Sequence, residues 1–324
     1  MADDQTPFEP WNERGEAPLA VFQGAEPEAP DWFNWAIAKT PERSFVAVDG
    51  ANIELLAWGE RGKPGLILVH GNSAHADWWS FIAPYLAQDY RVAAISLSGM
   101  GASDWRESYS FEIFSQELRA GAEATGLYEA ALKPIFIGHS FGGSQVFHAA
   151  RRYPDWMRGA ILVDTGFGGP PPAAEGFRQP QRRTSPNRVY PTLAAALARF
   201  RFMPPQGCKN LFIADFIARR SLKRAPLPEG GEGWTWRFDP QLWHKLDRSA
   251  MEALAMEASP TPLVQIVGEK SKIVERIQSA DPNSLLRGLK SVVIPDSEHH
   301  IMVDQPLALV AAIRALLIAW PQAL

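Results

Sequence analysis

Short hydrophobic runs alternate with longer amphipathic stretches along most of the chain. Eight of the short runs are rich in β-branched residues and predict strands. These runs cover residues 44–48, 53–58, 66–70, 92–97, 134–138, 160–164, 263–268 and 291–294. Residues 111–125, 141–152 and 305–320 have the length of helices, and the last stretch carries apolar side chains at helical spacing. This alternation predicts an α/β fold with an eight-stranded, mostly parallel sheet and helices on both faces.

The alternation fails after the sixth predicted strand. Residues 167–261 read mainly as helix and loop, so we expect a helical cap subdomain inserted there. Residues 44–166 and 262–324 then form one catalytic core. Residues 1–43 are rich in Pro, Glu and aromatic side chains with little periodicity, which favours an arm or short helix laid on the core.

Composition excludes several classes of protein. The 324 residues are 46% hydrophobic, 11% aromatic and 21% charged, which is typical of a globular chain. The net charge is −4 without a polybasic run, so we expect a small-molecule substrate and neither nucleic acid nor an anionic membrane surface as partner. The oligomeric state stays open.

The termini and the single cysteine bear on the cellular location of the protein and on disulfide formation. The N-terminus lacks the basic start and apolar core of a signal peptide, and Arg314 interrupts the most apolar segment, residues 307–320. We therefore expect a cytoplasmic protein that does not span a membrane. Cys208 has no cysteine partner, which excludes an internal disulfide and favours a structural role.

The predicted insertion is basic and aromatic. Residues 167–260 contain 14 Lys and Arg against 8 Asp and Glu, and eleven aromatic side chains that include Trp234 and Trp236. Such aromatics can anchor the packing of a small subdomain or line a substrate pocket, and both roles can coexist. We take Trp234 and Trp236 as substrate-binding candidates.

The strongest chemical signal is the segment from Gly138 to Gly142, which reads Gly-His-Ser-Phe-Gly. It follows a predicted strand and precedes a predicted helix, as a nucleophile on a tight strand-to-helix turn requires. Glycines two residues before and after Ser140 avoid clashes in that turn. The N–H group of Phe141, at the start of the helix, is available to a developing oxyanion.

With this motif the chain resembles the α/β-hydrolase family, over nearly all of residues 44–320. Three further segments match the family in order: His70-Gly71-Asn72, residues 99–104, and His299 followed by Gln305-Pro306. The resemblance implies that Asn72 supplies the second oxyanion N–H group, beside a Gly71 that lets the loop turn toward the nucleophile.

A serine nucleophile needs a histidine base, and seven histidines are available. The resemblance places the base seven residues before Pro306, at His299, with His300 as the adjacent alternative. His70 is expected to support its loop by hydrogen bonds. His139, next to the nucleophile, either packs the turn or contacts the substrate.

Several carboxylates are candidates for the acid of the triad. Many relatives carry Asp in a Gly-Glu-x-Asp segment after the seventh strand, but this chain has Ser271 at that position. A neutral hydroxyl cannot stabilise an imidazolium as a carboxylate does. Some family members place the acid after the sixth strand, which selects Asp164 and leaves Glu269, Glu275 and Asp296 as alternatives.

These residues predict a serine hydrolase of the carboxylesterase type (EC 3.1.1), with Ser140, His299 and Asp164 as the triad. We expect it to cleave an ester of a small, hydrophobic or aromatic substrate through an acyl-enzyme. Carbon–carbon, lactone or amide hydrolysis on the same triad, and a noncatalytic ligand receptor, remain alternatives. Dehalogenases and epoxide hydrolases of this fold require a carboxylate where Ser140 stands. No cofactor is expected, and no metal site, because the only closely spaced histidine pair is sequential.

Overall fold

The computed structural model describes residues 17–166, 185–247, 249, 259–272 and 289–320. In these residues an eight-stranded sheet has the order β1-β2-β4-β3-β6-β7-β11-β12. Its strands are β1 (Glu42–Val48), β2 (Ala51–Trp58), β3 (Gly65–Val69), β4 (Arg91–Ile95), β6 (Ile135–His139), β7 (Gly159–Val163), β11 (Leu263–Gly268) and β12 (Lys290–Ile294). The pairs β1-β2 and β2-β4 are antiparallel and the remaining pairs are parallel. The predicted sheet is thus confirmed, with strand bounds within two residues of those expected.

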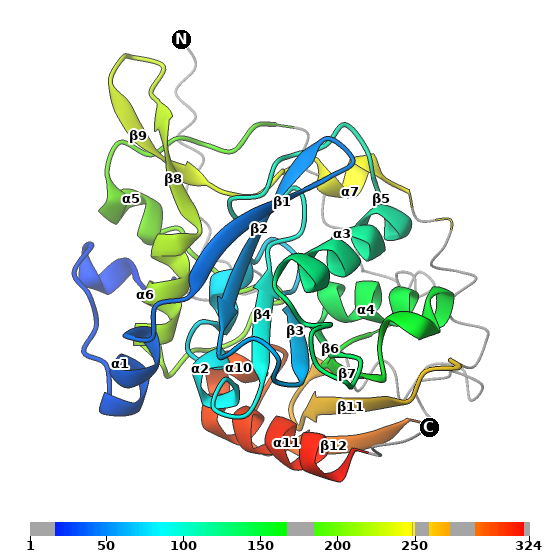
Figure 1. Cartoon of the computed structure of the whole chain (residues 1–324). Coiled ribbons are helices and arrows are strands. Elements are labelled where there is room, and N and C mark those ends of the chain that lie inside the picture. The colour runs from blue at the N-terminus through cyan, green and yellow to red at the C-terminus, as the bar shows by residue number, and fades with distance from the viewer. Residues whose placement is uncertain (1–16, 167–184, 248, 250–258, 273–288, 321–324) are drawn as a thin grey trace, which may run out of the picture.

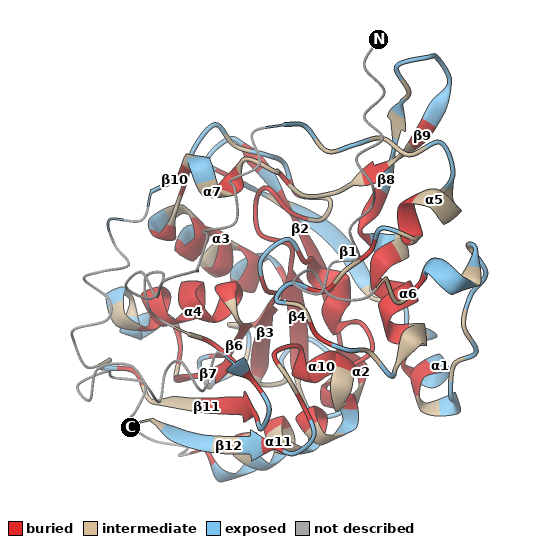
Figure 2. Ribbon diagram, turned by 180° about the vertical axis from the view of Figure 1, so that it is seen from behind, coloured by how far each residue is buried: buried red, intermediate tan, exposed pale blue. Residues whose placement is uncertain are grey.

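The sheet is covered on both faces, as its sequence pattern indicates. The helices are α2 (Ala83–Leu86), α3 (Phe111–Ala124), α4 (Phe141–Arg152), α10 (Ile301–Asp304) and α11 (Pro306–Ala319). Ile67 and Val69 of β3 pack in the cluster that contains α3 and α4. The alternate residues Leu66 and Leu68 point to the other face and pack in the cluster that contains α2 and α11. The central strands are therefore buried on both sides (Figures 1 and 2).

The insertion after β7 is more than helices and loops. Its described elements are α5 (Leu193–Leu197), α6 (Leu211–Arg220), β8 (Leu222–Pro226), β9 (Glu232–Trp236) and α7 (Leu242–Lys245). β8 and β9 form an antiparallel hairpin that the sequence pattern did not predict. A short parallel pair between β5 (Tyr109–Ser110) and β10 (Leu246–Asp247) then links the end of the insertion to the core. Residues 167–184 lie outside the described residues.

The described part of the predicted arm contacts the insertion. Helix α1 (Asp31–Ile37) lies beside α6 (Figure 1). The ring of buried Phe33 is 4.9 Å from that of Phe212 and 5.5 Å from that of Phe216, both on α6. It also lies 5.8 Å from the ring of Phe81 in the core. Among the described helices, none combines the length and apolar character needed to cross a membrane.

Candidate active site

Ser140 lies on the tight turn between β6 and α4. Its backbone has φ of 51° and ψ of −117°, a conformation that is rare and strained for residues other than glycine. A Cβ atom at Gly138 would lie 2.6 Å from the Gly142 carbonyl oxygen, so a side chain there would prevent the turn. The sequence thus builds the turn locally, and its serine lines a pocket at the carboxyl ends of the strands.

His299 lies between Ser140 and Asp164. It follows β12, directly before the His300 cap of α10. Its Nδ1 is 2.7 Å from Asp164 Oδ2, and its Nε2 is 2.9 Å from Ser140 Oγ. Because a carboxylate only accepts, Nδ1 carries the hydrogen and Nε2 accepts from the Ser140 hydroxyl. This tautomer is the one that can remove the serine proton.

Asp164 follows β7 with φ of 43°, and it is fully buried. Its Oδ1 accepts from the Gly268 N–H at 3.1 Å, and its Oδ2 accepts from the Ser271 hydroxyl at 2.6 Å. The hydroxyl at the position where many relatives carry the acid therefore binds the carboxylate that contacts His299.

The other carboxylates considered from sequence do not contact His299 in the described part of the chain. Glu269 accepts a hydrogen bond from the Asp296 N–H, and Asp296 pairs with Lys270 on the surface. Glu275 lies outside the described residues. The geometry accordingly favours Asp164 among the candidates.

Two backbone N–H groups lie beside the nucleophile. Asn72 and Ser140 line the same pocket, and Phe141 is the first residue of α4. Within the described residues, neither the Asn72 nor the Phe141 N–H donates to another protein group. Free N–H groups at a helix start and a loop next to a serine can donate to a developing oxyanion.

The pocket around Ser140 is narrow. It is lined by Gly71, Asn72, Ala74, Trp78, His139, Ser140, Met203, His299 and His300. Its volume open to the centre of a water molecule is about 10 Å³, room for roughly one water. No sequence motif marks Ala74, Trp78 or Met203, because only the fold brings their loops over the serine.

Trp234 and Trp236 are not among the residues that line this pocket. Trp234 lies under the Arg224 guanidinium, 4.2 Å from its ring centre, and the Trp236 ring is 6.3 Å from that of Phe200. Both tryptophans belong to the insertion and pack against the hydrophobic core cluster. Of the four substrate-binding candidates, the structure therefore brings only Gly71 and His139 to the nucleophile.

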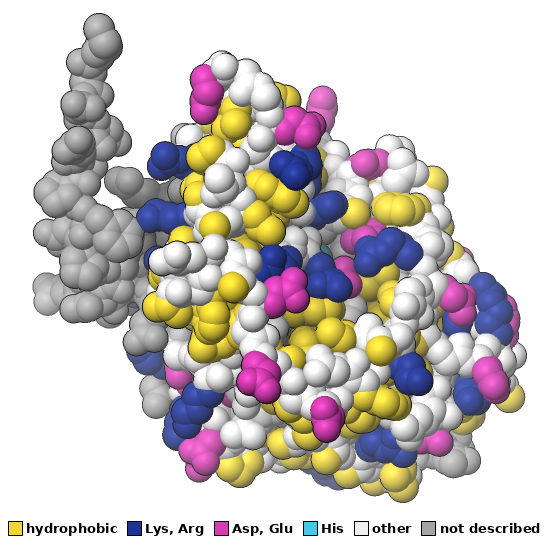
Figure 3. Space-filling model, turned by 90° about the vertical axis from the view of Figure 1, so that its left-hand side faces the viewer, with side chains coloured by type: hydrophobic (Ala, Val, Ile, Leu, Met, Phe, Trp, Pro, Cys, Tyr) yellow, Lys and Arg dark blue, Asp and Glu magenta, His cyan; other side chains and the backbone are white. Residues whose placement is uncertain are grey.

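Part of the positive charge of the insertion lies on its outer surface. Arg219 pairs with Asp215 at 2.6 Å, and Arg220 pairs with Asp77 at 3.4 Å. The Lys223 ammonium and the Arg224 guanidinium lie over the rings of Trp105 and Trp234, and both side chains are exposed. On this face, basic side chains lie among acidic and apolar ones (Figure 3). These four basic side chains therefore give no evidence for an anionic substrate.

Three other histidines of the site region are buried and neutral. His70 accepts from the Leu97 N–H at Nε2 and contacts the Gly71 carbonyl at 2.7 Å, and burial lowers its pKa to about 3. It supports its loop, as expected. The pKa values of His139 and His300 lie well below the usual value, mainly because the rings are buried and secondly because His299 is near. Neither ring therefore acts as a cation beside His299.

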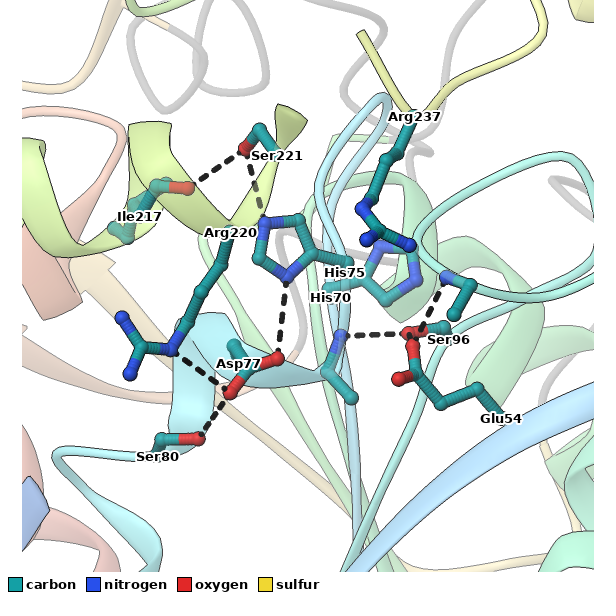
Figure 4. A network of polar contacts seen from close by, with 12 residues as sticks. Glu54, His70, His75, Asp77, Ser80, Ser96, Ile217, Arg220, Ser221 and Arg237 are labelled. Carbon is teal, nitrogen blue, oxygen red and sulfur yellow. Dashed lines mark hydrogen bonds and ion pairs between the residues drawn. The ribbon is translucent and has the colours of Figure 1, made fainter. Parts of the chain in front are cut away.

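A second Ser–His–Asp group occurs at the boundary between core and insertion (Figure 4). The Ser221 hydroxyl donates to the Ile217 carbonyl at 2.8 Å, so its oxygen accepts from His75 Nε2 at 2.9 Å. That histidine nitrogen carries a hydrogen and cannot remove a proton. Asp77 lies 3.9 Å from His75 Nδ1 and also contacts Arg43 and Arg220. This group links α6 to the loop after β3, and it does not have the geometry of a nucleophile.

Comparison with known proteins agrees with the fold and the motifs. Residues 66–313 match the model of the alpha/beta hydrolase family. Esterase Rv0045c of Mycobacterium tuberculosis is 26% identical over 285 residues, which cover 83% of this chain and 88% of that protein. The bifunctional epoxide hydrolase 2 of Mus musculus is 33% identical over 113 residues, 34% of this chain and 20% of that one. Esterases and epoxide hydrolases among the relatives support hydrolase activity.

Solved structures share the fold at low sequence identity. The thioesterase domain from the curacin biosynthetic pathway superposes with a TM-score of 0.63 at 22% identity, over 85% of this chain and 99% of that one. The family match spans well over half of the chain and includes Ser140 and His299. The chain therefore belongs to the alpha/beta hydrolase family.

Proposed function

We propose that this protein is a serine hydrolase that cleaves carboxylic esters of small substrates through an acyl-enzyme. The observation that carries the proposal is the continuous hydrogen-bonded path from Ser140 Oγ through His299 to Asp164. Its tautomer leaves Nε2 free to take the serine proton. The N–H groups of Asn72 and Phe141 have no partner within the described residues, and they support acyl transfer in particular because that reaction develops an oxyanion.

In the first half-reaction, Ser140 Oγ attacks the ester carbonyl carbon while His299 Nε2 takes the hydroxyl proton. Asp164 orients the ring and stabilises the imidazolium, and the N–H groups of Asn72 and Phe141 donate to the oxyanion. The carbon–oxygen bond to the alcohol then breaks. His299 returns the proton to the departing alkoxide, and Ser140 remains acylated.

In the second half-reaction, water replaces the alcohol. His299 Nε2 takes a proton from the water as its oxygen attacks the acyl carbon, and the same N–H groups bind the second oxyanion. The bond to Ser140 Oγ breaks, and the serine oxygen regains its proton from His299. The carboxylic acid leaves, and the enzyme returns to its starting state.

The pocket favours a short acyl group. Its walls include the apolar side chains of Ala74, Trp78 and Met203, and it has little free volume. An acetyl or propionyl group would displace these side chains less than a long acyl chain would. We therefore expect kcat/KM to fall as the acyl chain lengthens.

Epoxide hydrolysis is the second candidate that relatives suggest. On this fold that reaction needs a carboxylate at the nucleophile position, and this chain has Ser140 there. Hydrolysis of lactone, amide or carbon–carbon bonds would use the same triad. A noncatalytic receptor would bind esters without turnover.

A panel of p-nitrophenyl esters from acetate to long chains, with styrene oxide as the epoxide arm, tests the proposal. We expect ester turnover by the wild type and a loss of several orders of magnitude in kcat for Ser140→Ala. Ser144→Ala, one helical turn later, is the matched control that stays active. Turnover of the epoxide alone, or equal ester turnover by Ser140→Ala, would contradict the proposal.

A further inference from the structure

Three histidine rings surround the pocket beside the nucleophile. The ring centres of His139 and His299 are 4.8 Å apart, as are those of His299 and His300, and those of His139 and His300 are 5.5 Å apart. One nitrogen from each ring lies within 4.8 Å of the other two. All three residues are buried and line the pocket. The fold thus assembles a histidine cluster that sequence spacing did not indicate.

The hydrogen bonds determine which nitrogens carry lone pairs. His139 Nε2 is 3.0 Å from the His299 carbonyl oxygen, which only accepts, so Nε2 carries the hydrogen. His139 Nδ1 then has a lone pair, and this buried atom has no hydrogen-bond partner within the described residues. His299 Nε2 also has a lone pair, which faces Ser140.

His300 completes the set of donors. In the described part of the chain, neither ring nitrogen of His300 has a partner at full hydrogen-bond geometry, and the Met203 backbone lies near enough to favour a hydrogen on one of them. The other ring nitrogen of the neutral imidazole then carries a lone pair. The ring lies 5.4 Å from that of Trp78 and 5.2 Å from that of Phe202, and the side chain is only 4% exposed. Buried polar atoms without partners are costly, so a role that uses them is expected.

We propose that His139 Nδ1, His299 Nε2 and one ring nitrogen of His300 form a site for a divalent transition metal ion that inhibits the enzyme. Neutral imidazole nitrogens bind Zn²⁺, Ni²⁺ and Cu²⁺ well, whereas Mg²⁺ and Ca²⁺ prefer oxygen ligands. The pocket has room for about one water-sized body, which suits a single ion. Zinc–nitrogen distances of about 2.0–2.1 Å in a tetrahedral site place the nitrogens about 3.4 Å apart. The ligand atoms now lie within 4.8 Å of one another, so the widest pair must draw together by up to about 1.4 Å.

Inhibition follows from the ligand set. A metal ion on His299 Nε2 occupies the lone pair that accepts the Ser140 proton, so the serine is no longer activated. The ion leaves the N–H bond between His299 and Asp164 intact, and no redox step is involved. The inhibitory part of this inference rests on the proposed function, but binding of the ion does not.

Direct binding tests the site without any turnover. Untagged Ser140→Ala protein is titrated with Zn²⁺ by calorimetry and with Co²⁺ by visible absorption. We expect one ion per chain and the intense absorption of a low-symmetry, four-coordinate Co²⁺ site. His300→Phe retains the aromatic packing, and His139→Gln retains a donor near the His299 carbonyl, so each added change should weaken binding at least about tenfold. Adding His244→Asn, at an exposed histidine, should leave binding unchanged.

The effect on turnover is measured separately with the ester that the wild type cleaves best. Zn²⁺, Ni²⁺ and Cu²⁺ should inhibit the wild type reversibly, with recovery on adding a chelator, while Mg²⁺ and Ca²⁺ should not. The metal concentration for half-inhibition should rise at least about tenfold in His300→Phe. Unchanged binding in both His300→Phe and His139→Gln, or no binding by Ser140→Ala, would overturn the site. Binding without inhibition would overturn its role, and absent ester turnover would instead count against the proposed function.

Discussion

The carboxylate of Asp164 receives three hydrogen bonds, from His299, Gly268 and Ser271. We predict that Asp164→Asn lowers kcat by about 10³ to 10⁴ because it removes the charge that stabilises the imidazolium and favours the wrong tautomer. Steady-state kinetics on the best ester, with circular dichroism to confirm folding, measures this. Glu269→Gln and Asp296→Asn are the matched controls. Near-full turnover by a folded Asp164→Asn enzyme would place the acid elsewhere.

Ser271 is a positioning residue in this account, because its hydroxyl binds Asp164 and would act on His299 only through that carboxylate. Its hydroxyl is 2.6 Å from the Asp164 oxygen that accepts from His299. A hydrogen bond to a charged group contributes about 1.5–3 kcal/mol, so we predict that Ser271→Ala lowers kcat by roughly tenfold or more. KM should change little, because in this account Ser271 does not contact the substrate. Ser271→Thr should restore kcat, and a kcat equal to that of the wild type would contradict this role.

At the residue scale, the sequence indicated the residues of the proposed triad better than their surroundings. Ser140 and His299 belong to local motifs, and the serine at position 271 directed attention to Asp164. The approach of His139 to His299 could not be predicted in this way. The hydrogen bond between the His139 ring and the His299 carbonyl joins residues 160 positions apart, one at the end of β6 and the other in the loop after β12. The pocket residue Met203 likewise depends on how the insertion lies over the core.

At the scale of elements, the strands of the sheet were predictable because each is a compact apolar run. The hairpin of β8 and β9 was not predictable in this way. β8 carries exposed Lys223 and Arg224, so its sequence is not a continuous apolar run. One signal was present. Gly230 and Gly231 both have positive φ at the turn, and two adjacent glycines are typical of a tight hairpin.

The hydrogen bond between His75 and Ser221 links α6 to the loop that carries Asn72. We predict that Ser221→Ala destabilises the protein by about 1–3 kcal/mol, because it leaves a buried His75 N–H without an acceptor. Urea unfolding at neutral pH measures the difference. Ser249→Ala, on the exposed surface, is the control that should change little. An unfolding free energy equal to that of the wild type would show that the link contributes no stability.

For the whole molecule, buried neutral histidines make stability depend on pH. The pKa values of His70, His75, His139 and His300 are all lowered, with burial as the largest cause. Below a pH of about 6.5 the unfolded chain binds protons at these positions while the folded chain does not. Their stabilising contribution is therefore complete above that pH and is lost as the pH falls, down to about 3 for His70.

Asp304 acts in the opposite direction. Burial raises its pKa from 3.8 to about 6, so the folded chain retains this proton longer than the unfolded chain. Its contribution is present at low pH and is lost as the pH rises through that window.

His300→Phe tests this balance at one position. It removes a buried polar ring without breaking a hydrogen bond known in the described residues, so we predict a higher unfolding free energy than that of the wild type. The slope of that free energy against pH between about 5 and 6.5 should decrease by up to about 1.4 kcal/mol per pH unit, the value for one proton. Urea unfolding across this range measures both, and an unchanged slope would contradict the neutral state of His300.

The central claim is that Ser140 forms an acyl-enzyme. The most direct measurement is to quench the wild-type enzyme with acid during turnover of a short p-nitrophenyl ester and map the acylated peptide by mass spectrometry. The account predicts one acyl group per chain, on Ser140, and none on Ser140→Ala treated in the same way. An acyl group on another residue whose replacement abolishes turnover, with Ser140→Ala still active, would contradict it.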